Sequence, residues 1–130
     1  MNNVVGVGVI LETSRGTYLL QRRDHNTTRN PGRIAPFGGG LEGAETTTQC
    51  AQRELQEELD LRLDLDNLHS IDIFESHHIP GTYIHMFVAK DIDTKNLKLQ
   101  EGTNIVEVSK EDAFTNNEVT DFTKEVLRKV

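Results

Sequence analysis

Residues 39–61 read GGLEGAETTTQCAQRELQEELDL and carry most of the information in this chain. Thr46 and Gln49 have the spacing of a capping box, in which two residues at a helix start bond each other's backbone. The apolar stripe that follows has one residue at every fourth position: Ala51, Leu55 and Leu59. This pattern predicts an amphipathic helix over residues 46–59, preceded by a glycine-rich turn.

The predicted helix places like charges side by side at Glu54, Glu57 and Glu58. At about 100° per residue, these side chains share one edge of the helix. Their repulsion costs a few tenths of a kcal/mol per pair, which a solvated surface can absorb. A second explanation is a hard divalent cation such as Mg²⁺, which prefers carboxylate oxygens and often shares substrate phosphates. The turn formed by residues 37–40 could bring backbone amides close to such phosphates.

The same segment resembles the Nudix box of the Nudix (MutT-type) hydrolases. That box is a glycine, five residues, a glutamate, seven residues, then Arg-Glu-aliphatic-any-Glu-Glu-any-Gly-aliphatic. The residues in register with it are Gly39, Glu45, Arg53, Glu54, Leu55, Glu57, Glu58 and Leu61. One position departs, because Asp60 stands where the box has glycine. More loosely, the resemblance extends over the whole chain, including an early hairpin that ends in an arginine pair.

The resemblance implies an α/β protein with the Nudix fold, an α/β/α sandwich around a mixed central sheet, in one domain over residues 1–130. The residue pattern agrees, since a hairpin comes early and helices lie mid-chain and at the end, which indicates a mixed sheet covered by helices on its faces. The predicted strands are Val4–Leu11, Gly16–Arg22, Ile71–Glu75, Tyr83–Ala89 and Ile105–Val108. We predict a loop over residues 23–36 and a C-terminal amphipathic helix marked by Val119, Phe122, Val126, Leu127 and Val130.

By the same resemblance, the chain should cleave a nucleoside diphosphate linked to a further group, with water attacking phosphorus. Glu54, Glu57 and Glu58 would then hold Mg²⁺, with Mn²⁺ as a substitute, helped by a carbonyl of Gly38 or Gly39. Either Glu54 or Glu57 could orient or deprotonate the water, and the sequence leaves that choice open. Gly39 would also let the substrate phosphates come close to the backbone.

Arg53 and Glu45 would form a supporting pair, in which Arg53 sets the carboxylate orientations and Glu45 anchors the loop to the helix. A simple surface salt bridge is the alternative for this pair. The Asp60 position should end the helix in the left-handed conformation, where aspartate costs about 1 kcal/mol or less relative to glycine. Asp60 would therefore affect the helix end and not the chemistry, unless it marks a non-catalytic member of the family.

Candidates outside the box are fewer and less specific. Glu101 could be a further metal ligand or an ordinary loop residue. Arg22 and Arg23 end a strand with side chains on opposite faces, and Arg23 is the better candidate for binding substrate phosphates. Asn117 could bond a nucleobase edge or simply belong to a turn. The pair His77-His78 reads as a solvated loop, because neighbouring strand residues face opposite ways and would not share a metal.

Composition limits the partners. The formal net charge of −7 argues against a nucleic-acid duplex or an anionic membrane, but not against a small polyphosphate. No apolar run has the length of a membrane span, and the N-terminus lacks the basic region of a signal peptide. The single cysteine, Cys50, cannot form an internal disulfide and reads as a small buried hydrophobe, so a reducing cytoplasm is expected. A homodimer could form through an exposed sheet edge, which the sequence does not locate.

The substrate is constrained mainly by what the chain lacks. The marks of ADP-ribose, dinucleoside polyphosphate and coenzyme A subfamilies are absent at their expected places. The sequence therefore favours a nucleoside triphosphate, an oxidised one included, cleaved to monophosphate and pyrophosphate. ADP-ribose or another nucleotide sugar is the alternative substrate. A non-catalytic nucleotide-binding domain and a metal-independent acidic interaction domain are the alternatives from other functional classes.

Overall fold

The computed structural model describes residues 3–26, 30–97 and 104–130. Its strands are β1 (Val4–Thr13), β2 (Tyr18–Arg22), β3 (Ile34–Ala35), β4 (Phe37–Gly40), β5 (His69–Glu75), β6 (Tyr83–Ile92) and β7 (Asn104–Val108). Its α-helices are α1 (Thr47–Leu59), α2 (Lys110–Thr115) and α3 (Asp121–Leu127), with short 3₁₀ turns at Leu65–Asn67 and Thr94–Asn96. Within these ranges, no helix is long and apolar enough to cross a membrane.

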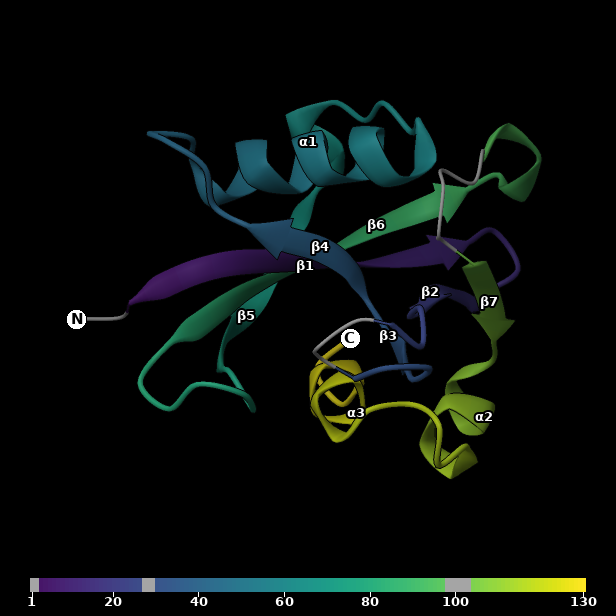
Figure 1. Ribbon diagram of the computed structural model, residues 1–130. Coiled ribbons are helices and arrows are strands. Elements are labelled where there is room, and N and C mark those ends of the chain that lie inside the picture. The colour runs from purple at the N-terminus through teal and green to yellow at the C-terminus, as the bar shows by residue number, and fades with distance from the viewer. Residues whose placement is uncertain (1–2, 27–29, 98–103) are drawn as a thin grey trace.

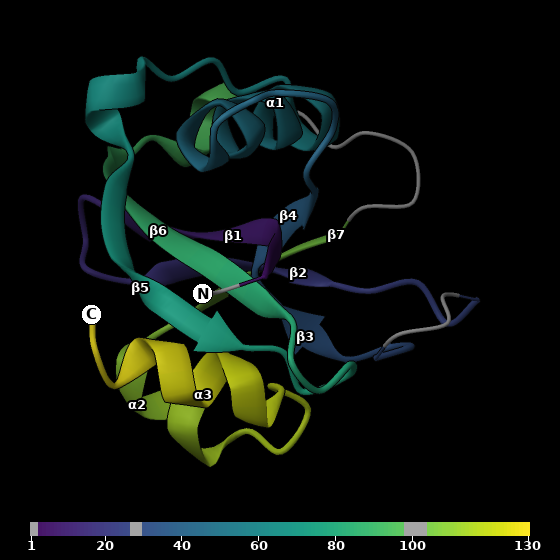
Figure 2. The same ribbon diagram turned by 90° about the vertical axis from the view of Figure 1, so that its left-hand side faces the viewer.

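The strands form one mixed sheet centred on β1. Strand β1 pairs in parallel with β6 and antiparallel with β2 and β4. Strand β6 pairs with β5, and β2 pairs with β3 and β7, all antiparallel. Helix α1 covers one face, and α2 and α3 cover the other (Figures 1 and 2). This arrangement confirms the expected α/β/α sandwich.

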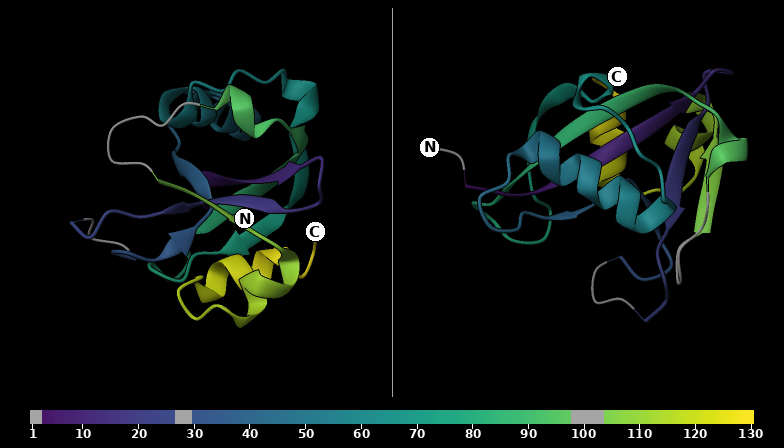
Figure 3. Two further views of the ribbon diagram at one scale, coloured as in Figure 1. Left: turned by 90° about the vertical axis from the view of Figure 1, so that its right-hand side faces the viewer. Right: turned by 90° about the horizontal axis from the view of Figure 1, so that it is seen from above.

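Alternation along β1 divides the core into two layers. Val7, Val9 and Leu11 belong to the layer beneath α1. Ile10 belongs to the layer beneath α2 and α3, and by the same alternation Gly6 and Gly8 face that side too. Figure 3 shows α1 lying across the sheet directly above β1 and β4. The helix that carries the acidic residues is thus held over the glycine-rich part of the sheet.

Helix α1 forms as its sequence predicts. The Thr46 side chain accepts a hydrogen bond from Gln49 N, and the Gln49 side chain accepts one from Thr46 N, so the capping box is present. Cys50 is fully buried beside the apolar stripe, as expected. At the other end, Asp60 has φ 52° and ψ 30°, which is the left-handed conformation expected for the box glycine.

The structure differs from the sequence-based prediction between residues 23 and 40. That segment was expected to be a loop and a turn, but it contains β3 and β4. Strand β4 pairs with β1 over four positions, including Gly8 opposite Gly38 and Val7 opposite Gly39. Glycine has low intrinsic strand propensity, so only this long-range pairing makes the segment a strand. Helix α2 was also not predicted, since it is a short helix whose start depends on one capping residue, Ser109.

The conformation of Asp60 leads to a stability prediction. Replacing Asp60 with Gly should raise the free energy of unfolding by up to about 1 kcal/mol, because glycine adopts positive φ without a Cβ penalty. Asp60→Ala should lower it by about 1 kcal/mol, since alanine tolerates this conformation less well than aspartate does. Urea unfolding of the three proteins measures both changes. A less stable Asp60→Gly variant would show that the aspartate side chain stabilises the helix end.

Candidate functional site

Arg53 is the centre of an ion-pair network at the start of the acidic edge of α1. Its Nε and Nη2 donate to the two oxygens of Glu45 at 3.0 and 2.7 Å. Its Nη1 donates to Glu57 at 2.8 Å, and Nη2 also donates to the carbonyl of Gly40 at 3.1 Å. Arg53 lowers the pKa of Glu45 to about 2, mainly through the hydrogen bonds between them. The expected pair therefore exists, and it ties the loop after β4 to the helix.

Glu54 and Glu58 lie on the part of the edge that packs against β4. Glu58 accepts a hydrogen bond from the backbone N–H of Gly38 at 3.2 Å. Glu54 lies so close to Gly39 that a Cβ added there would collide with its carboxylate. Burial, followed by the charge of Glu54, raises the pKa of Glu58 to about 7. Burial also raises the pKa of Glu54. Two partly desolvated carboxylates thus meet beside the glycine strand.

Glu57 is oriented differently from this pair. Its side chain is 55% exposed and points to Arg53. Among the residues that the structure describes, no three Asp, Glu, His or Cys side chains are grouped to hold a metal ion. Glu101 lies outside the described residues. The donor chemistry of Glu54 and Glu58 nevertheless fits a divalent cation, because two carboxylates whose ionised forms burial disfavours lie close together beside the β4 backbone.

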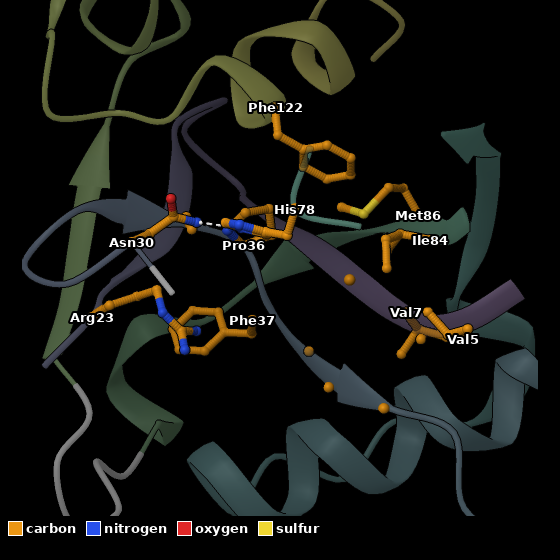
Figure 4. A pocket seen from close by; sticks show the side chains of 16 residues that line it. Val5, Val7, Arg23, Asn30, Pro36, Phe37, His78, Ile84, Met86 and Phe122 are labelled. Carbon is orange, nitrogen blue, oxygen red and sulfur yellow. Dashed lines mark hydrogen bonds between the residues drawn. The ribbon is translucent and has the colours of Figure 1, made fainter. Parts of the chain in front are cut away.

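A pocket of about 290 Å³ opens on the other side of β4 (Figure 4). In Figure 4, the Phe122 ring and Met86 lie on the upper side of the pocket, and Arg23 lies beside Phe37 at one end. His78 and Asn30 come from two different loops and lie within hydrogen-bonding distance, with 3.2 Å between Nε2 and Nδ2. Most side chains that line the pocket are apolar, and Arg23, Asn30 and His78 add polar groups, a mixture common in small-molecule sites.

Glycines shape the floor of this pocket. A Cβ at Gly8 would lie 2.6 Å from the sulfur of Met86, and one at Gly6 would lie 2.8 Å from the carbonyl oxygen of Gly39. Gly8 therefore makes room for Met86, and Gly6 lets β4 approach β1 closely. Gly38, Gly39 and Gly40 complete the lining on the β4 side. The glycine strand thus separates the carboxylates from the pocket without side chains in between.

The two arginines at the end of β2 have different surroundings. Arg23 lines the pocket, and its charge lowers the pKa of Glu58, against the larger effect of burial. Arg22 is not among the residues that line this pocket; it donates to Glu118 and to the carbonyl of Gly32. Asn117 is exposed and does not line the pocket either. The structure thus brings Arg23 to the candidate site, but not Arg22 or Asn117.

The sequence does not predict several of the residues that line the pocket. Phe122 was interpreted as a core residue of the last helix, and His78 as part of a solvated loop. Asn30 lay in a segment without any recognised motif. The one available signal was the spacing of Gly6 and Gly8, because glycines two residues apart in a strand leave a hollow on one face.

Comparisons with known proteins agree with this geometry. The chain matches the NUDIX domain family model over residues 2–130. The chain belongs to the Nudix family. An uncharacterized Nudix hydrolase from Listeria innocua is 33% identical over 96 residues, which are 72% of this chain and 55% of that protein. The Nudix chain described here thus spans about half the length of the curated relatives it matches.

Solved structures confirm the Nudix fold. The MutT Nudix hydrolase from Burkholderia pseudomallei has a TM-score of 0.80 at 17% identity, covering 100% of this chain and 98% of its own. The C. elegans Ap4A hydrolase has a TM-score of 0.72 at 18% identity, covering 95% of this chain and 93% of its own. Arg53, Glu54, Glu57 and Glu58 therefore lie on a helix of a Nudix fold, and Glu45 lies in the loop just before that helix.

The raised pKa of Glu58 predicts how stability depends on pH. The pKa of Glu58 is about 7 in the folded protein and 4.5 for an ordinary glutamate. The folded state holds this proton more tightly, so the associated stabilisation is complete below pH 4.5 and is lost as pH rises to about 7. With a chelator present, the free energy of unfolding of the wild-type protein should fall by about 1–3 kcal/mol over this pH interval because of Glu58. In Glu58→Gln this contribution to the fall should be absent.

Urea unfolding at several pH values measures this loss, and Glu111→Gln on α2 is the matched control. The control should keep the wild-type pH dependence. Parallel profiles for wild type and Glu58→Gln would mean that Glu58 titrates as an ordinary glutamate.

Proposed function

We propose that this Nudix domain, residues 1–130, is a Mg²⁺-dependent pyrophosphohydrolase that cleaves a nucleoside diphosphate linked to a further group. The favoured substrate is a nucleoside triphosphate, an oxidised one included, cleaved to monophosphate and pyrophosphate. The observation that carries the proposal is the shared glycine strand. Glu54 and Glu58 contact Gly38 and Gly39 from the α1 side, and the same glycines line the pocket. A polyphosphate bound along Gly38–Gly40 would therefore lie close to the carboxylates, with no side chain of these three glycines in between.

Glu54 and Glu58 would hold Mg²⁺, or Mn²⁺ as a substitute, with Glu57, Glu101 and the Gly38 carbonyl as further ligand candidates. When bound, such an ion would screen the phosphate charge and lower the pKa of the attacking water. The requirement is physical, since an anionic polyphosphate otherwise repels an anionic nucleophile.

The chain's own residues would position and neutralise the reacting groups. Arg53 holds Glu57 at 2.8 Å while binding Glu45 through two hydrogen bonds, so the Glu57 carboxylate has a fixed orientation. Either Glu57 or Glu54 would accept the proton of the attacking water. Glu57 is the more exposed of the two, whereas burial raises the pKa of Glu54. Arg23, at the edge of the pocket, supplies positive charge for the phosphates.

The pocket supports a substrate with one nucleobase. Its volume of about 290 Å³ is at the lower end of the range for small-molecule sites. Phe122 offers an aromatic ring for stacking, and the Asn30 and His78 side chains offer hydrogen bonds to a base edge. A nucleoside triphosphate would place its base here and its phosphates along Gly38–Gly40.

A panel of nucleotides tests the proposed function directly. Wild-type protein with Mg²⁺ should release pyrophosphate from at least one nucleoside triphosphate, ranked by kcat/KM, and chelation should abolish the release. ADP-ribose and a nucleotide sugar belong in the same panel. Glu57→Gln should lower kcat by at least about 100-fold without unfolding the protein, and Glu111→Gln should not. Binding of nucleotides without turnover would instead support a non-catalytic nucleotide-binding domain.

Gly39→Ala tests whether the glycine strand positions the carboxylates. The added methyl group would displace the Glu54 carboxylate, which is the end of a flexible side chain, so the fold should remain intact. We expect kcat/KM to fall by about tenfold or more while stability changes by less than about 1 kcal/mol. Gly40→Ala is the comparison, because its Cβ would lie 3.8 Å from the nearest heavy atom, Val5 O. Equal effects of the two substitutions on kcat/KM would contradict this role for Gly39.

A further inference from the structure

The connection between α2 and α3, residues 116–120, is bound to the sheet through Arg22. The two terminal nitrogens of Arg22 donate to the two oxygens of Glu118 at 3.0 and 3.2 Å. Nη1 also donates to the carbonyl of Gly32 at 3.0 Å. Arg22 therefore joins three segments that are far apart in the chain: β2, the turn before β3, and the α2–α3 connection.

Backbone hydrogen bonds and a second arginine hold the same connection. Ile34 N donates to the carbonyl of Glu118 at 2.9 Å, and Thr120 N donates to the carbonyl of Ile34 at 3.0 Å. Arg33 donates through Nε to the same Glu118 carbonyl at 3.0 Å. The position of residues 116–120 is thus fixed relative to β3, which leads directly into β4.

The connection sets where α3 begins, and α3 carries one wall of the pocket. Thr120 is the N-cap of α3, and its side chain accepts a hydrogen bond from Thr123 N at 3.2 Å. Two residues after the cap, Phe122 reaches the pocket (Figure 4). Its ring packs edge-on with Phe74 and His77, with centroid distances of 6.0 and 5.3 Å. A shift of the connection would therefore move an aromatic wall of the pocket.

Arg22 also contacts the segment that carries a second wall of the pocket. Gly32 belongs to the turn that contains Asn30, and Arg33 N donates to the carbonyl of Asn30 at 3.0 Å. Asn30 itself lines the pocket. One guanidinium group thus contacts the segment that supports Asn30 and the segment that supports Phe122.

We propose that Arg22, through Glu118 and Gly32, is a positioning residue that sets the distance between the two walls of the nucleotide pocket. It does not contact the substrate itself. This inference rests on the proposed function of the pocket. The planar guanidinium group makes all three hydrogen bonds at once, which the single ammonium of a lysine would not reproduce.

The proposed role differs from that of an ordinary surface salt bridge. The Arg22 side chain is 34% exposed and that of Glu118 is 53% exposed, so their pairing should contribute little to global stability. Loss of the pair should instead weaken nucleotide binding, because the walls would no longer be held at a fixed separation. The chemical step, at Glu54 and Glu57, should be largely unaffected.

Arg22→Gln, Arg22→Lys and Glu118→Gln test this role by steady-state kinetics. We expect each substitution to raise KM by about fivefold or more and to change kcat by less than about twofold. The pH profile of kcat should remain that of wild type. Calorimetry with a non-hydrolysable nucleoside triphosphate should show the same weakening in Kd. Arg15→Gln is the matched control, since it removes an exposed Arg–Glu pair with Glu107 at 2.6 Å that lies away from the pocket.

A measurement without nucleotide separates this proposal from the proposed function. With 4-fluorophenylalanine incorporated, the ¹⁹F resonance of residue 122 is assigned by its loss in Phe122→Leu. It should shift in Arg22→Gln and Glu118→Gln, and remain in place in Arg15→Gln. An unchanged resonance, or KM values equal to that of Arg15→Gln, would overturn the positioning role. If the residue 122 resonance shifts in these variants but the protein neither binds nor cleaves nucleotides, the proposed function is refuted. The contact by which Arg22 positions Phe122 is then still supported.

Discussion

Strand β4 consists of glycine at every position after Phe37, and the close approach of other groups to it is the constraint on which the site depends. A Cβ at Gly38 would collide with the Val7 carbonyl, and one at Gly39 would collide with the Glu54 carboxylate. Helix α1 can therefore pack its acidic edge against the backbone of β4. The pocket uses the other side of the same backbone. Because these positions have no side chains, the carboxylates of α1 and the pocket can lie next to the same β4 backbone.

This packing has an electrostatic consequence. Arg53 lies near four carboxylates, those of Glu42, Glu45, Glu54 and Glu57, at distances between 2.7 and 3.5 Å. It stabilises the charge of Glu45 most strongly, while burial raises the pKa values of Glu54 and Glu58. The ionised forms of Glu54 and Glu58 are thus disfavoured by burial, whereas that of Glu45 is stabilised by Arg53. Carboxylates with perturbed pKa values in such a cluster are more common at functional sites than elsewhere.

Local signals explain what could be predicted from the sequence. The capping box and the apolar stripe specify α1 by contacts within a few residues, and the left-handed Asp60 follows from the helix end. Strands β3 and β4 depend instead on pairing with β2 and β1, which no local pattern reports. The same distinction applies to the site. The acidic edge was visible in one segment, whereas Asn30, His78 and Phe122 meet only because three separate segments fold together.

The arginine pair at the end of β2 shows how one local rule produces two roles. Neighbouring residues of an extended chain face opposite sides, so the side chains of Arg22 and Arg23 leave the backbone in opposite directions. Arg23 lines the pocket beside the carboxylates, and Arg22 binds Glu118 beneath the sheet. The direction in which each side chain leaves the backbone therefore determines the different surroundings of the two arginines. The alternation predicts that the two arginines have different roles. What Arg22 contacts depends on the position of residues 116–120, which the local sequence does not give.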